Sequence, residues 1–100
     1  MTMMRRSEDI LAAAAVKWGR LQLLRGDDAV ALACALKDEG ATILGFDGFL
    51  AREDGYQIDG CLSADLDLLD LGISSRADFS KGFFYAWRYR EDVFFELTWE

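Results

Sequence analysis

The sequence predicts an α+β fold in which two N-terminal helices pack on a four-stranded antiparallel sheet. Three observations support this prediction. Apolar residues recur at helical spacing in the first 40 residues, alternate at strand spacing over residues 41–50, and alternate again, now mostly as aromatics, over residues 83–99. The chain has 100 residues, no proline and no linker-like or low-complexity stretch. We therefore expect a single domain over residues 1–100.

The two predicted helices span residues 8–18 and 27–39. Ser7 is a candidate N-cap for the first helix and Asp27 for the second, because their side-chain oxygens can accept a free backbone N–H of the first turn. The small and apolar residues of both segments fall on one side of a helix. Residues 21–24 between them are expected to form a short apolar connector.

The predicted sheet consists of two hairpins. Residues 41–50 alternate like a strand, with a bend or bulge expected at one of their glycines. Asp54-Gly55 is a strong turn signal, and residues 56–58 return as a short second strand. Residues 83–99 predict the second hairpin, which turns at a polar tripeptide and lies at the centre of the core.

Two segments permit alternatives. Residues 61–71 fit either a short helix capped by Ser63 or an edge strand, with the helical turn favoured. Residues 76–81 fit a short helix closed by Gly82. The rival to the last hairpin is one longer helix over residues 76–89. That helix would contain Gly82 in its interior at a cost of about 1 kcal/mol relative to alanine, which favours the hairpin.

The net charge of −7 is concentrated in the middle of the chain. Residues 38–70 contain nine carboxylates and one base, Arg52, a net charge of −8. These carboxylates either are scattered solvated groups that keep the protein soluble or form a patch for a basic partner. Asp47 and Asp59 are expected to be held most rigidly, by the hairpin strands. The predicted partner-binding residues are Asp47, Glu53, Asp54, Asp59, Asp65, Asp67 and Asp70.

The composition argues against catalysis and cofactor binding. The chain contains no histidine, which excludes Ser-His-Asp and Cys-His nucleophilic sites and the common zinc sites. Residues 65–76 fail the calcium-loop pattern, because Leu69 stands at the fifth position, Asp70 at the sixth and Arg76 at the twelfth. We predict a protein that is not an enzyme and has no cofactor and no metal site.

Nucleic-acid and membrane binding are not expected. Residues 81–85 partly match an RNA-recognition motif, but Phe84 stands where a small residue is required, and a chain of charge −7 lacks the basic surface that phosphates need. No apolar run approaches the roughly 20 residues of a membrane span. Glu8 and Asp9 interrupt the N-terminal apolar stretch where a signal peptide would be continuous. We predict a cytoplasmic protein.

The two cysteines, Cys34 and Cys61, lie in apolar stretches of sequence without a CxxC motif. Free cysteine is among the most buried residue types. Both are therefore predicted to be reduced thiols of the core, without a disulfide.

The heptapeptide Ile43-Leu44-Gly45-Phe46-Asp47-Gly48-Phe49 follows a predicted helix that ends at Gly40. It resembles an Ile-Leu-Gly-Gly-Asp-Val-Tyr stretch that follows two helices in one family of small bacterial immunity proteins, which belong to polymorphic-toxin and contact-dependent growth-inhibition systems. The matching positions are Ile43, Leu44, Gly45 and Asp47, and the positions that depart are Phe46, Gly48 and Phe49. The resemblance covers under half of the chain. It implies a cytosolic, non-catalytic protein that binds a cognate toxin domain, often a nuclease with a basic active-site surface.

Two functions remain open from the sequence. The first is an immunity protein that neutralises a basic toxin domain by occupying its phosphate sites with carboxylates, assisted by electrostatic steering. The alternative is a non-catalytic adaptor or chaperone-like module, which could include a homodimer formed through the edge of the aromatic sheet. In both cases the partner is a protein.

Overall fold

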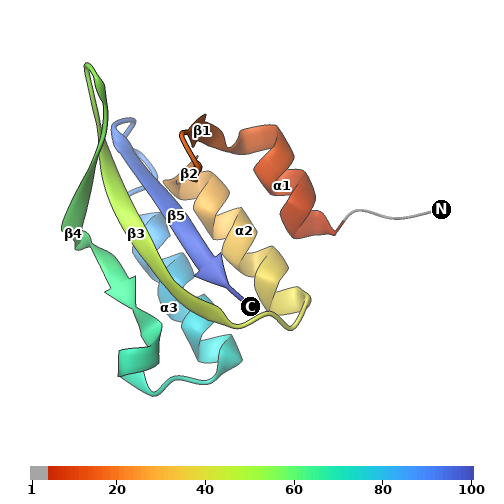
Figure 1. Ribbon diagram of the computed structural model, residues 1–100. Coiled ribbons are helices and arrows are strands. Elements are labelled where there is room, and N and C mark those ends of the chain that lie inside the picture. The colour runs from red at the N-terminus through yellow and green to blue at the C-terminus, as the bar shows by residue number, and fades with distance from the viewer. Residues whose placement is uncertain (1–4) are drawn as a thin grey trace.

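The computed structural model describes residues 5–100 as a five-stranded antiparallel sheet with three α-helices on one of its faces (Figure 1). The order of strands across the sheet is β1-β2-β5-β3-β4. The elements in chain order are α1 (Arg6–Ala14), β1 (Val16–Trp18), β2 (Leu21–Arg25), α2 (Gly26–Asp38), β3 (Ile43–Arg52), β4 (Gly55–Asp65), the 3₁₀ helix η1 (Leu66–Leu69), α3 (Ile73–Ala86) and β5 (Val93–Trp99).

This architecture corrects the predicted two helices on a four-stranded sheet. The α+β class is right, but the sheet has five strands, a third long helix is present, and helices and strands are interleaved along the chain. Two segments account for the difference. Residues 16–25 are strands where a helix end and a connector were expected, and residues 83–86 are helical where a strand was expected.

Helix α1 ends at Ala14, whereas the sequence predicted that it would extend to Trp18. Val16 and Trp18 instead pair with Leu23 and Leu21 in the β1–β2 hairpin. Ser7 is not the N-cap but a buried residue inside α1, where its backbone N–H and its Oγ donate to the two carboxylate oxygens of Glu39, at 3.0 and 2.7 Å. The start of α1 is thus held by a side chain from the end of α2.

The second helix is confirmed, as α2. It begins one residue earlier than expected, at Gly26, and buries Ala29, Leu32, Ala33 and Leu36 among its residues. Gly26 lies against α3, because a Cβ there would stand 2.7 Å from the carbonyl oxygen of Phe84. Close packing of these two helices therefore depends on a residue without a side chain.

Helix α3 runs through Gly82 without a break, although the sequence predicted that a short helix would end there. The expected hairpin over residues 83–99 is wrong, and the rival helix is right to Ala86. Tertiary packing outweighs the strand-like alternation, because Ala77, Ser80 and Phe84 are buried at helical spacing. Only β5, the second half of the predicted hairpin, is a strand, and it occupies the centre of the sheet.

The β3–β4 hairpin is confirmed, although β4 is much longer than expected. Pairing shifts from Phe46↔Ala64 to Gly48↔Asp59, so that residues 60–63 bulge out of β4. A Cβ at Gly48 would lie 2.1 Å from the Cβ of Leu62, so only glycine fits opposite the bulge. For residues 61–71 both alternatives hold in part, since the strand continues to Asp65 and η1 follows.

Two apolar clusters stabilise the two faces of the sheet. The larger lies between the sheet and the helices, where the rings of Phe46, Phe84 and Phe95 contact one another. The smaller consists of Leu23, Phe49 and Phe94 on the face without helices. There the sheet folds over itself: Trp18 of one edge strand contacts Tyr56 of the other at a ring-centroid distance of 5.5 Å.

Candidate acidic binding surface

The helix-free face of the sheet carries a pair of carboxylates next to its small apolar cluster. Asp47 of β3 lies directly opposite Glu96 of β5, two residues along the strands from the pair of Phe49 and Phe94. Paired residues project to the same face and alternate along each strand, so Asp47 and Glu96 share the face of Phe49. The sheet therefore holds the two carboxylates side by side on its open face.

A hollow of about 280 Å³ lies beside Asp47, where β3, β4, η1 and the end of β5 meet. Three of the seven predicted residues line it, namely Asp47, Asp65 and Asp67. The other lining residues are Leu44, Gly45, Phe46, Ala64 and Thr98. A Cβ at Gly45 would approach the carbonyl oxygen of Ala64 to 2.6 Å, so close strand contact requires glycine here.

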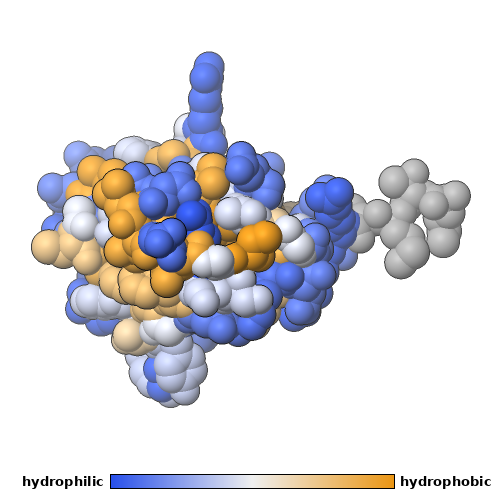
Figure 2. Space-filling view, turned by 90° about the horizontal axis from the view of Figure 1, so that it is seen from below, coloured by the Kyte–Doolittle hydropathy of each residue, from blue (hydrophilic) through white to orange (hydrophobic). Residues whose placement is uncertain are grey.

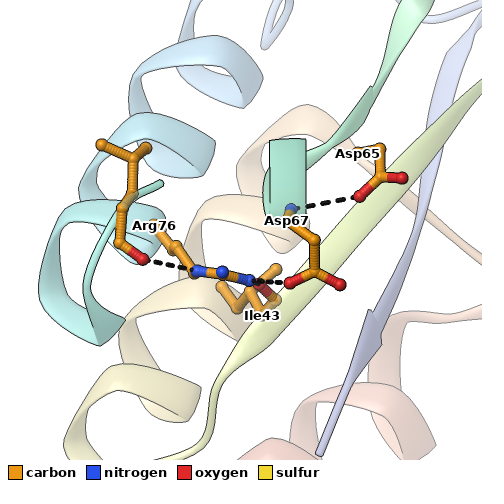
Figure 3. A network of polar contacts seen from close by, with 5 residues as sticks. Ile43, Asp65, Asp67 and Arg76 are labelled. Carbon is orange, nitrogen blue, oxygen red and sulfur yellow. Dashed lines mark hydrogen bonds and ion pairs between the residues drawn. The ribbon is translucent and has the colours of Figure 1, made fainter. Parts of the chain in front are cut away.

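Asp67 is not a free carboxylate, because Arg76 of α3 neutralises it (Figure 3). The Arg76 side chain is only 13% exposed and donates to the carboxylate of Asp67 at 2.7 Å. It also donates to the carbonyl oxygens of Ile43, at 3.1 Å, and Leu71, at 2.8 Å. In the same view Asp65 Oδ1 accepts the backbone N–H of Asp67 and so caps η1. The network fixes one wall of the hollow rigidly.

Asp47 and Glu96, by contrast, have no cation within ion-pair distance anywhere in residues 5–100. Glu96 accepts one hydrogen bond, from the backbone N–H of Gln22 in β2, at 3.0 Å. Like charges directly opposite each other in a sheet are destabilising. The carboxylates of Asp47 and Glu96 therefore destabilise the protein when no partner is bound.

The remaining four predicted residues do not join this surface. Glu53 and Asp54 form the turn of the β3–β4 hairpin, roughly 20 Å along the strand from Asp47. Asp59 pairs with Gly48, which places it on the opposite face from Asp47, and its carboxylate accepts the backbone N–H of Cys61. Asp70 ends η1 in the left-handed conformation, with φ of 52°.

Sequence reasoning missed Glu96 and Arg76. Glu96 lies outside the acidic segment of residues 38–70, but it shares a strand face with Phe94 and Thr98 by simple alternation, and this signal was available in the sequence. Arg76 was placed in a short helix without a partner. Its contact with Asp67 depends on the course of η1, which the sequence left open.

An exposed apolar patch was also missed. Leu68, Leu69 and Ile73 are 81%, 45% and 44% exposed, although they lie close together in the chain where η1 leads into α3. This end of the molecule is at the bottom of Figure 1, and the view from below shows apolar side chains gathered around polar ones (Figure 2).

The cysteines differ from expectation in their surroundings. Both are free, but Cys61 is exposed in the bulge of β4 and Cys34 is half-buried, so neither is a fully buried core thiol. In residues 5–100 no group of three or more acidic, cysteine or histidine side chains is arranged to hold a metal ion. The longest helix in the same part of the chain has 14 residues, too few to cross a membrane.

No family model matches this chain, and no curated protein matches its sequence.

Proposed function

We propose that this protein is an immunity protein, which binds the basic active-site surface of a cognate bacterial toxin domain through the helix-free face of its sheet. The partner in this proposal is a protein, with a nuclease domain as the best fit. The binding residues are Asp47 and Glu96, with Asp65 at the rim of the hollow. Nothing in this mechanism requires catalysis or a cofactor.

The observation that carries the proposal is the unpaired Asp47–Glu96 couple. Within residues 5–100 only Asp38, Asp67, Asp78 and Asp92 have a cation at ion-pair distance. What distinguishes Asp47 and Glu96 from the other unpaired carboxylates is that they lie directly opposite each other on adjacent strands. A cation from a partner would relieve the repulsion between Asp47 and Glu96. The complex would then recover stability that the free protein lacks, and opposite charges would accelerate association.

The apolar neighbours of these carboxylates support the same surface. Phe49 and Phe94 are 6% and 8% exposed, and Trp18, 42% exposed, covers the same face from the edge. Interfaces commonly combine an aromatic centre with a polar rim. Phe49 and Phe94 are buried beneath this face, so Trp18 is the exposed aromatic of the cluster that a partner would contact beside the acidic pair.

The test is binding to the C-terminal domain of the protein encoded beside this gene, measured at two salt concentrations. The variant Asp47→Asn/Glu96→Gln should weaken binding by about tenfold or more and reduce its salt dependence. The matched control, Glu53→Gln/Asp54→Asn, removes two charges from the hairpin turn and should leave affinity within about threefold, since rim charges contribute little. Equal effects of both variants, or no effect of either, would count against this surface.

Co-expression supplies the functional arm of the experiment. Cells that produce the toxin domain should survive with this protein and die with the Asp47→Asn/Glu96→Gln variant. If the neighbouring domain is harmless, or if the variant protects fully, the immunity function is wrong. The exposed apolar patch of Leu68, Leu69 and Ile73 favours the adaptor alternative. That alternative would be supported if partner binding were lost in Leu68→Ser/Ile73→Ser but not in the variants of the acidic residues.

A further inference from the structure

The outer side of α3 is an uncovered helix face centred on Gly82. Exposed positions follow one another along it at spacings of four and three residues: Ser75, Phe79, Gly82, Ala86 and, just beyond the helix end, Tyr89. Phe79 is 41% exposed and its neighbour Tyr85 is 55% exposed. A helix that is apolar on both sides is expected to be covered on both. Within one chain, only the inner side of α3 is covered.

Gly82 has no role within one copy of the chain. A Cβ added there would meet nothing within 4 Å, unlike one added at Gly26, which would collide with α3. Glycine inside a helix is less favourable than alanine unless another backbone must approach closely. Since no part of residues 5–100 approaches Gly82, the close neighbour would come from outside the chain.

We propose that α3 is the contact surface of a homodimer, in which the α3 helices of two copies pack antiparallel with Gly82 of each at the twofold axis. This inference goes beyond the proposed function and does not rest on it. In an antiparallel pair, contacts form between residues on the same flank of the helix face that lie at nearly equal distances from position 82 in opposite directions. Phe79 then faces Ala86 of the second copy, Tyr85 faces Asp78, and Tyr89 faces Ser75.

The residues of this face are complementary under the twofold rotation. The exposed ring of Phe79 covers the small Ala86 of the other copy, and this contact occurs twice, once on each side of the axis. The large Tyr89 meets the small Ser75, and the two glycines meet at the centre. Helices with small residues at their crossing approach more closely than the usual distance of about 8–10 Å.

The charges on this side of the molecule permit such a contact despite the net charge of −7. Residues 73–90 contain one acid, Asp78, and four bases. Asp78 is paired with Lys37 at 3.0 Å and Lys81 at 3.3 Å. The guanidinium of Arg88 lies over the rings of Tyr85 and Tyr89, at 3.5 and 4.2 Å from their centroids.

Antiparallel packing would place opposite charges on neighbouring turns of the two helices. Asp78 of the second copy would face Tyr85, whose ring lies against the guanidinium of Arg88. The attraction would occur twice, because of the twofold axis. Asp47 and Glu96 lie on the other face of the sheet and would stay accessible in the dimer.

The test is sedimentation velocity of the full chain over a series of concentrations, at low and high salt. Two helices of this length make a small interface, so we expect a dimer that dissociates on dilution. Added salt should strengthen it, because it screens the repulsion between two copies of charge −7. Toxin binding should respond to salt in the opposite direction, so the two proposals fail independently.

Gly82→Glu should raise the dissociation constant of the dimer by about tenfold or more, because it places two carboxylates at the axis. The space around Gly82 is open, so the monomer should keep its circular dichroism spectrum and unfolding midpoint. The matched control is Gly72→Glu, at the start of the same helix and also in open space. It should leave the dissociation constant within about twofold.

Cross-linking adds a positional readout. In a Cys34→Ala/Cys61→Ser background, Gly82→Cys should oxidise to a covalent dimer, because a disulfide forms when two Cα atoms lie about 4.4–6.8 Å apart. Gly72→Cys should not. A protein that stays monomeric at every concentration, or a dimer that Gly82→Glu leaves unchanged, would overturn the proposal. If the protein is monomeric and the Gly82→Glu variant no longer binds the toxin, then this face of α3 binds the toxin instead of a second copy.

Discussion

Trp18 and Tyr56 meet edge to face, with ring centroids 5.5 Å apart, although they belong to the two outermost strands of a five-stranded sheet. Tyr56 continues the contact inward to Phe94, at 5.2 Å. The sheet is therefore curled at this end so that its two edges touch above the small apolar cluster. This closure explains how Leu23 is fully buried on a face that no helix covers.

We expect the contact between Trp18 and Tyr56 to couple the two edges energetically. A double-mutant cycle of Trp18→Ala and Tyr56→Ala, measured by urea unfolding, should give a coupling free energy of about 0.5–1.5 kcal/mol. Leu68→Ala, at a position 81% exposed, serves as the control and should change stability by less than about 0.5 kcal/mol. A coupling near zero would mean that the edges touch without stabilising the fold.

Gly55 should be indispensable to this closure. Its φ of +143° is strained for any other residue, and an added Cβ would stand 2.6 Å from the ring of Trp18. We predict that Gly55→Ala destabilises the protein by roughly 1–3 kcal/mol. If the cause is the clash as well as the backbone, Trp18→Ala should recover part of that loss in unfolding experiments.

Removing a charge from the acidic pair should stabilise the free protein. Asp47→Asn relieves the repulsion with Glu96, and we predict a gain of about 0.2–1 kcal/mol in the free energy of unfolding. The same change at Glu53, in the exposed hairpin turn, should have no measurable effect. A loss of stability in Asp47→Asn would show that the carboxylate serves the fold and not a partner.

Arg76 should be among the least replaceable polar residues of the chain. Arg76→Met leaves the carbonyl oxygens of Ile43 and Leu71 without their donor, and the carboxylate of Asp67 without its cation. We expect a loss of about 2–4 kcal/mol by urea unfolding. Asp67→Asn alone should cost much less, because that carboxylate is 60% exposed.

The ion pair between α2 and α3 predicts a specific pH dependence. Hydrogen bonds from Lys37 and then Lys81 lower the pKa of Asp78 below its usual value. A carboxylate with a lowered pKa in the folded state stabilises the fold above its unfolded pKa, and this stabilisation is lost as the pH falls through the folded pKa. Asp78→Asn should therefore lower the urea midpoint at neutral pH and have no effect well below about pH 4. A difference that persists in strong acid would contradict this assignment.

Elements that depend on local sequence signals were predicted correctly, whereas elements that depend on contacts distant in sequence were not. The second helix and the β3–β4 hairpin depend on local signals, namely a run of small apolar residues and the Asp54-Gly55 turn, and both were right. Phe83, Tyr85, Trp87 and Tyr89 alternate as in a strand, but Phe83 and its neighbour Phe84 pack on Phe46 from a helix. That choice depends on the position of β3, which no local pattern contains.

The candidate site was predictable in part for the same reason. Asp47 was found because it lies in a clear strand, whereas its neighbour Glu96 is 49 positions away in sequence and becomes a neighbour only through the β3–β5 register. Asp59 was expected to belong to the same binding surface as Asp47, because the hairpin strands hold both. Asp59 pairs with Gly48 in the regular register that runs from the hairpin turn, and alternation along β3 therefore places it on the face opposite to Asp47.

The bulge in β4 also bears on how this protein behaves at high concentration. A long, regular edge strand is a template on which further chains can add, and stacked strands of this kind lead to fibrils. In β4 the template is interrupted: Asp59 turns back to bind the N–H of Cys61, and the hydroxyl of Ser63 joins the carbonyl oxygen of Asp59 to the N–H of Gly48. An incoming strand would find only short, misaligned stretches of free backbone on either side of these residues. The irregular stretch that follows Asp59 thus protects an aromatic-rich chain from amyloid growth.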